Sequence, residues 1–195
     1  MRETNGQIRK FWRNSPLEQD AFHMRNLRQA ILSLLDEQMG STNFQLCDRA
    51  VEIGGNLNPL SYAAYSQLKQ EPEASILVDH IYARQKPVNV FPNTRFLSRG
   101  IPQDSSVIKP FMEQAPTTLF LESVMNYVGS RAVNALIQRA SQVLIANNAL
   151  TFMVAPTHDQ AALFPDQILR DLEDKGFNSI ALHKGLFHIV GIFSK

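Results

Sequence analysis

The chain has little of several features that would identify a class of protein at once. Cys47 is the only cysteine among 195 residues, which excludes an internal disulfide and is compatible with a reducing compartment. The five histidines are dispersed, and no Cys/His spacing matches that of a metal site. The sequence therefore predicts a protein without a structural disulfide and without a metal centre.

An excess of one charge and long apolar runs are missing as well. The formal net charge is +1, from 19 Lys and Arg against 18 Asp and Glu, and the basic residues form no stripe. Because nucleic-acid binders usually carry a basic face, we expect no nucleic-acid partner. No apolar run reaches the roughly 18 residues of a membrane helix, and the first residues lack the apolar segment of a signal peptide. We therefore expect a cytoplasmic protein with no membrane association.

What is present is the composition of a globular protein, with 44% hydrophobic and 19% charged residues and no internal repeat. Over residues 16–39 the apolar residues recur at helical intervals, and Gly40 follows as a stop signal. We predict that residues 1–45 form an N-terminal helical extension. Residues 46–195 are then predicted to form one compact α/β domain.

Beyond residue 46, short apolar strands alternate with helical patterns. We predict strands over 49–53, 74–79, 94–98, 117–122, 149–154, 179–182 and 186–193, and helices over 59–69, 131–146 and 165–175. This alternation is typical of a mostly parallel sheet covered by helices on both faces. His183-Lys184-Gly185 separates the last two strands as a turn. The predicted fold is α/β: a doubly wound, mostly parallel seven-stranded sheet with a terminal antiparallel hairpin, preceded by an N-terminal helix.

The turn after the first predicted strand is the place to look for a site. In open α/β sheets, ligands bind beyond the carboxyl ends of the strands, where the strand order reverses. The turn reads Glu52-Ile53-Gly54-Gly55-Asn56, and its glycines permit close approach of a ligand to the backbone. Asp79 ends the second strand, where a carboxylate can accept both hydroxyls of a ribose. This pattern indicates a nucleotide-type cofactor.

The order of these features, over Ala50–Lys195, resembles that of the class I S-adenosylmethionine-dependent methyltransferases. Within that superfamily the leucine carboxyl methyltransferase-like group is the most similar. Its E-L-G-A-G-L-D-T-R-A-Y turn aligns with Glu52–Tyr62, and its Val-Asp strand end with Val78-Asp79. Its P-T-L-F-x-x-E-x-x-x-x-Y segment is similar to Thr117–Tyr127.

The resemblance implies S-adenosylmethionine as the cofactor and a set of residues that bind it. These are Glu52, Gly54, Gly55, Asn56, Asp79, Ile101, Gln103, Glu122 and Arg28. The stretch from Gly100 through Asp104, with Ile101 and Gln103, would hold the adenine, and Glu122 would lie beside the cofactor's amino group or the substrate. Simpler roles stay open: Glu52 bonding to loop amides, Asp79 and Glu122 as ordinary strand-end carboxylates, and Arg28 as a solvated helix residue. No residue in the sequence identifies a general base.

The chain also departs from the superfamily pattern. The glycine motif is E/D-x-G-x-G-x-G, and here Asn56 and Asn58 stand where its second and third glycines belong. Long insertions of the kind that form a substrate lid in carboxyl methyltransferases are missing, so the leucine carboxylate substrate is not carried over. We predict a methyltransferase that acts on a small-molecule O or N nucleophile. The N-terminal helix is expected to cover the cofactor, to line the acceptor pocket or to form a homodimer contact.

Two other functions stay open. One is a methyltransferase-like protein that has lost catalysis and acts as a binding or scaffold protein, which the altered glycine turn favours. The other, ranked third, is a nicotinamide-dependent oxidoreductase on a related fold. That class predicts a G-x-G-x-x-G turn, which this sequence does not contain.

Overall fold

The structure is a computed structural model of the chain, and it describes part of the residues. The described ranges are 29–30, 32–37, 46–55, 57–98, 101–122, 150–156, 170, 172–184 and 188–194.

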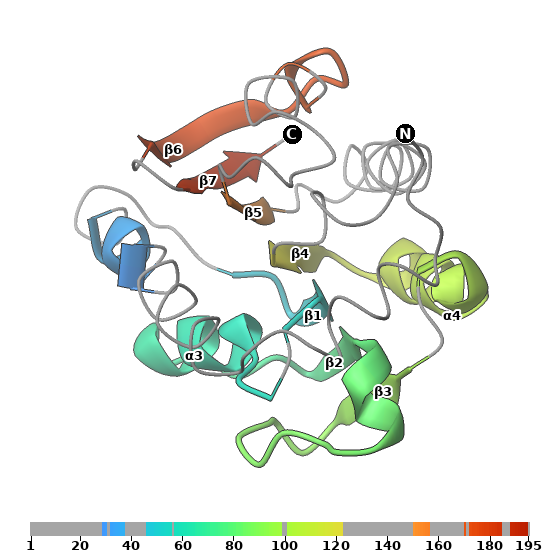
Figure 1. The fold of residues 1–195 in the computed structure, drawn as a ribbon. Helices are drawn as coiled ribbons and strands as arrows, with labels where there is room; N and C mark the ends of the chain where they lie inside the picture. Colours follow the sequence, from blue (N-terminus) through green and yellow to red (C-terminus); the bar gives the residue numbers. More distant parts are fainter. Residues whose placement is uncertain are drawn as a thin grey trace.

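The strands form one sheet in the order β3-β2-β1-β4-β5-β7-β6 (Figure 1). They are β1 Arg49–Ile53, β2 Ala74–Val78, β3 Thr94–Leu97, β4 Thr117–Glu122, β5 Leu150–Pro156, β6 Asn178–Lys184 and β7 His188–Ser194. The first five pair in parallel, and β7 pairs antiparallel with both β5 and β6. The predicted α/β class and parallel sheet are confirmed. The turn between β6 and β7 lies outside the described residues.

Helices cover both faces of the parallel part of the sheet. Helix α3, Leu60–Gln67, lies on one side and α4, Ile101–Gln114, on the other (Figure 1). A short 3-10 helix, η1 at His80–Ala83, follows β2. Because neighbouring residues of a strand point to opposite faces, each central strand is buried on both sides, as its continuous apolar sequence predicted.

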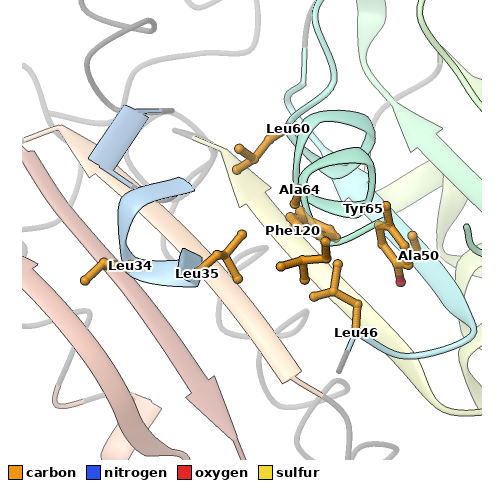
Figure 2. Close-up of a cluster of buried hydrophobic side chains, with 9 residues drawn as sticks. Leu34, Leu35, Leu46, Ala50, Leu60, Ala64, Tyr65 and Phe120 are labelled. Carbon is orange, nitrogen blue, oxygen red and sulfur yellow. The ribbon is translucent and has the colours of Figure 1, made fainter. Parts of the chain in front are cut away.

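A cluster of buried side chains joins the N-terminal region to the face of the sheet that α3 covers. Residues 29–30 and 32–37 are helical, within the predicted lead-in helix. From this segment Leu34 and Leu35 pack in one cluster with Leu60 and Ala64 of α3 and with Phe120 of β4 (Figure 2). The Gln67 side-chain amide adds hydrogen bonds to this segment, 2.9 Å to the Leu32 carbonyl and 2.5 Å to the carboxylate of Asp36. The division of the chain at residue 45 stays a prediction.

Helix α4 is an element that the sequence pattern did not predict. Pro110 lies inside it, and a proline removes a backbone donor and usually ends a helix. Here the Pro110 ring faces outward, whereas Ile108 and Met112, four residues apart, are buried. The burial of this face outweighs the proline signal.

The remaining predictions agree with the structure to within a few residues where it describes them. The predicted helix over 59–69 is α3, and the predicted third strand over 94–98 is β3. The predicted helix over 131–146 lies outside the described residues. In the part of the chain that is described, no helix is long and apolar enough to cross a membrane.

Candidate functional site

The carboxyl ends of three neighbouring strands bring the predicted site residues to one edge of the sheet. Ile53 of β1 is in register with Val78 of β2 and with Leu121 of β4. The residues that follow them, Gly54, Asp79 and Glu122, are therefore level with one another. The chain runs outward from β1 to β3 and returns to the other side of β1 as β4, so the order reverses between β1 and β4. This reversal is where open α/β sheets bind ligands.

The glycine turn leaves β1 in a conformation that favours glycine. Gly54 has a φ of 88°, in the region that L-residues rarely adopt, and its amide donates to the Val78 carbonyl at 2.9 Å. Gly55 is also required to be a glycine, but for a different reason, which is the space available for a side chain. A Cβ at this position would lie 2.6 Å from Cδ of Glu52 and closer still to Oε1, so only a glycine fits above this carboxylate.

Glu52 caps the helix that follows the turn. Its side chain is completely buried, and its two oxygens accept from the amides of Leu60 (2.7 Å) and Ser61 (2.9 Å), the first two residues of α3. The Ser61 hydroxyl donates to the same carboxylate. These contacts satisfy amides that a helix leaves without an internal partner, and Pro59 at the N-cap provides no side-chain bond to them.

This position agrees with the simpler of the two roles considered for Glu52. The carboxylate bonds to loop and helix amides beneath the turn, and in this structure it has no exposed surface with which to touch a ligand. A direct contact with a cofactor stays a prediction. The structure adds a role through α3 and Gly55, because the carboxylate fixes both.

Asp79 lies at the end of β2 and is half-buried. Its Oδ1 accepts from the Ile81 amide at 3.0 Å, which caps η1, and its own amide donates to the Leu97 carbonyl of β3 at 3.1 Å. These bonds fix the orientation of the side chain at the edge of the sheet. A carboxylate held in this way suits the ribose contact predicted for it.

The other predicted residues are only partly placed. Ile101 and Gln103 belong to the first turn of α4, where no helix was predicted, and Glu122 is the last residue of β4. Asn56 and Arg28 lie outside the described residues. No group of three or more His, Cys, Asp or Glu side chains within the described ranges is arranged to hold a metal ion.

Ser61 is a residue that the sequence analysis missed. It is buried with 2% of its surface exposed, and it supplies both its amide and its hydroxyl to Glu52. A serine at the start of a predicted helix is a known capping signal, but here it donates to a carboxylate nine residues earlier in the chain rather than acting as a cap.

Tyr65 occupies the opposite end of α3, near the amino ends of β1 and β4. Its hydroxyl donates to the Cys47 carbonyl at 2.5 Å and lies 3.5 Å from the hydroxyl of Thr118, which in turn accepts from the Cys47 amide at 2.9 Å. Burial raises the pKa of Tyr65 well above its usual value, against a smaller lowering by the bond to Thr118. The glycine turn lies at the opposite ends of these strands, so we interpret the hydrogen bonds of Tyr65 as structural.

Comparison with known structures places the fold. The chain is similar to an O-methyltransferase family protein from Burkholderia thailandensis, with a TM-score of 0.57 and 11% identity over 90% of this chain and 59% of that one. It is also similar to human N-acetylserotonin methyltransferase in complex with SAM, with a TM-score of 0.55 and 10% identity over 86% of this chain and 51% of the human one. The chain has the fold of these methyltransferases.

A third similar structure is closer to this chain in length. Magnesium protoporphyrin IX methyltransferase from Synechocystis PCC 6803 with bound SAM matches with a TM-score of 0.54 and 11% identity, over 86% of this chain and 79% of that one. The chain spans little more than half the length of the two structures named before it. No protein-family model and no curated protein matches the sequence. What is shared at such identities is the fold.

Proposed function

We propose that this chain binds S-adenosylmethionine at the turn after β1 and transfers its methyl group to a small-molecule O or N nucleophile. The observation that carries the proposal is the edge where Gly54, Asp79 and Glu122 are level on adjacent parallel strands, at the reversal of strand order. Within the proposal, the antiparallel β6–β7 pair at the far side of the sheet corresponds to the terminal hairpin of the methyltransferase fold. The finer resemblance to the leucine carboxyl methyltransferase-like group stays a prediction.

The chemistry of the edge suits this cofactor. The bare backbone of Gly54 and Gly55 permits close approach, and the oriented Asp79 carboxylate suits the two hydroxyls of a ribose. Ile101 and Gln103 are proposed to contact the adenine, and Glu122 the amino group or the acceptor. Asn56 and Arg28 complete the proposed set.

Glu52 argues against the nicotinamide-dependent alternative. In dinucleotide-binding folds the amides at the start of the first helix bind the pyrophosphate. Here the amides of Leu60 and Ser61 already donate to a buried carboxylate, so the start of α3 carries its own anion. A second anionic group at this point would be repelled, whereas the sulfonium and ammonium of S-adenosylmethionine, which outnumber its one carboxylate, would be attracted.

The reaction needs little covalent chemistry from the chain. A bound sulfonium supplies an activated methyl group: its carbon–sulfur bond breaks as the bond to the acceptor forms, the electron pair stays on sulfur, and the acceptor loses a proton. The contribution of the residues is then to hold the methyl carbon in line with the acceptor and to exclude water. The base that takes the proton is not among the residues assigned.

The experiment is calorimetric titration of the purified chain with S-adenosylmethionine and with its demethylated product. Asp79→Ala tests the ribose contact, and Asp79→Asn keeps an oxygen for the Ile81 amide while removing the charge. Glu73→Ala is the matched control, because Glu73 is an exposed carboxylate just before the same strand. Binding by the wild type and the control, weakened about tenfold or more in both Asp79 variants, would support the proposal. No binding of either ligand by the wild type would overturn it.

The catalytically silent binding protein remains the second candidate, favoured by Asn56 and Asn58 in place of the usual glycines. It predicts binding of both ligands without turnover. Incubation with labelled S-adenosylmethionine and a panel of phenols, amines and carboxylates separates the two candidates, since methylated product arises only from an active enzyme.

A further inference from the structure

Two neighbouring residues of α3, Leu60 and Ser61, donate hydrogen bonds to the carboxylate of Glu52. Ser61 donates its backbone amide and its hydroxyl to Oε2, whereas the Leu60 amide donates to Oε1. Both side chains are buried, at 0% exposure for Glu52 and 2% for Ser61. A buried charge keeps one orientation only while its donors hold it.

The orientation of this carboxylate determines where the turn lies. The space beside Gly55 is filled by Glu52, with Cδ 2.6 Å and Cγ 3.1 Å from the point where a Cβ would be. The backbone of the turn therefore rests on the side chain beneath it. Gly54, the neighbouring residue, faces the edge at which the proposed ligand lies.

The two kinds of donor from Ser61 have separable effects. Loss of the hydroxyl leaves the amides of Leu60 and Ser61 on the carboxylate, so the cap of α3 stays in place. What is lost is the side-chain bond that fixes Oε2 from a second direction. The fold then keeps its helix, while the carboxylate gains freedom beneath Gly55.

We propose that Ser61 is a positioning residue of the site: its hydroxyl fixes the Glu52 carboxylate under Gly55, and through it the turn on which the ligand rests. The proposal rests on the proposed function, because it assigns Ser61 to the same site. Since the Glu52 charge lies beneath the turn, its position acts more strongly on a ligand that carries a positive sulfonium than on the neutral thioether product.

The test compares affinities for S-adenosylmethionine and for its demethylated product in wild type, Ser61→Ala and Ser66→Ala. Ser66 is an exposed serine on the same helix and serves as the matched control. Ser61→Ala is expected to bind S-adenosylmethionine about tenfold more weakly, with a smaller loss of affinity for the product. Ser66→Ala is expected to bind both ligands as the wild type does. The change in the ratio of the two affinities is a readout that a general loss of stability would not produce.

Each outcome has one meaning. Binding by the wild type that Ser61→Ala leaves unchanged, or an equal loss for both ligands, overturns the positioning role and leaves the proposed function standing. Absence of binding by the wild type overturns the proposed function and the positioning role with it. If thermal unfolding shows that Ser61→Ala does not fold, Ser61→Cys carries the same test, because it keeps the volume of the side chain with a much weaker donor.

Discussion

Gly55 lies directly above the carboxyl group of Glu52, so close that a Cβ at position 55 would be 2.6 Å from Cδ. The described glycines with positive φ are Gly54 and Gly176, so at Gly55 the restriction is space and not backbone conformation. One buried carboxylate thus determines both the start of α3 and the identity of a residue in the turn. The proposed ligand site and the fold are coupled at this point.

Gly55→Ala is expected to destabilise the protein, because its new methyl group overlaps Glu52 and forces the carboxylate from its bonds to α3. We expect a loss of about 2–3 kcal/mol in the free energy of unfolding, as for overpacking at a buried site. Urea denaturation followed by circular dichroism measures it.

The double variant Glu52→Ala/Gly55→Ala provides the control. If the overlap with Glu52 is the cause, removal of the carboxylate makes room for the methyl group, and the loss in the double variant is smaller than the sum of the single losses. Strictly additive losses would mean that Gly55 is required for another reason.

Glu52→Ala alone is expected to lower the free energy of unfolding by about 2–3 kcal/mol, because two buried amides lose a charged acceptor. Glu52→Gln should lose nearly as much, since its NH2 group brings a donor toward an amide donor. Glu71→Ala, at an exposed carboxylate before β2, is the control and should change stability by less than about 0.5 kcal/mol. A Gln variant as stable as the wild type would show that the cap does not need a carboxylate.

The alkaline stability of the protein should depend on Tyr65. Burial raises its pKa in the folded protein above the value of about 10 that an unfolded chain has. The folded state therefore keeps a proton that the unfolded state loses, so this contribution is complete below pH 10 and is lost as pH rises above it. The slope is at most about 1.4 kcal/mol per pH unit.

Denaturation of wild type and Tyr65→Phe at pH 8 to 11 measures this effect. The Phe variant is less stable at pH 8, because it lacks the bond to the Cys47 carbonyl, but the difference from wild type should shrink as the pH rises above 10. Tyr62→Phe, at a half-buried tyrosine of the same helix, reports what loss of a hydroxyl does elsewhere on α3. A gap between wild type and Tyr65→Phe that is constant over this range would contradict the prediction.

The alternation of apolar strands and helical patterns was enough to predict the class of fold. Short apolar runs such as 49–53 and 74–78 are unambiguous when a turn follows each of them, and parallel strands then bring the ends with Gly54 and Asp79 to the same edge. Helix α4 was missed because Pro110 is a local signal, whereas the burial of Ile108 and Met112 depends on the sheet beneath them.

The hydrogen-bond partners of Glu52 could not be identified from the sequence, for a similar reason. The motif places a carboxylate before a glycine turn, but which way it faces depends on where α3 starts and on Ser61, nine residues later. The sequence left two roles open for Glu52, a contact with the cofactor and hydrogen bonds to loop amides, and the structure shows bonds of the second kind, to the first amides of α3. Contacts between a strand and the helix that follows it are tertiary, and no local pattern encodes them.

The last prediction concerns the N-terminal helical segment. Leu35 is completely buried in the cluster with Leu60 and Phe120, so Leu35→Ala should leave a cavity between this segment and the sheet. The expected loss is about 2–4 kcal/mol in the free energy of unfolding, the usual range for a buried leucine. Ser33→Ala, at an exposed residue of the same segment, is the control and should be close to neutral.

The measurement also tests the division at residue 45. If residues 46–195 fold as a unit to which the extension adds only a cover, Leu35→Ala should produce a separate early transition and leave the main one in place. If the segment belongs to the core, the unfolding transition stays single and moves as a whole to lower denaturant. The cluster favours the second outcome, because Leu35 belongs to the same buried cluster as Leu60, whose amide donates to Glu52. A loosened segment is then expected to disturb the cap of α3 and the turn above it.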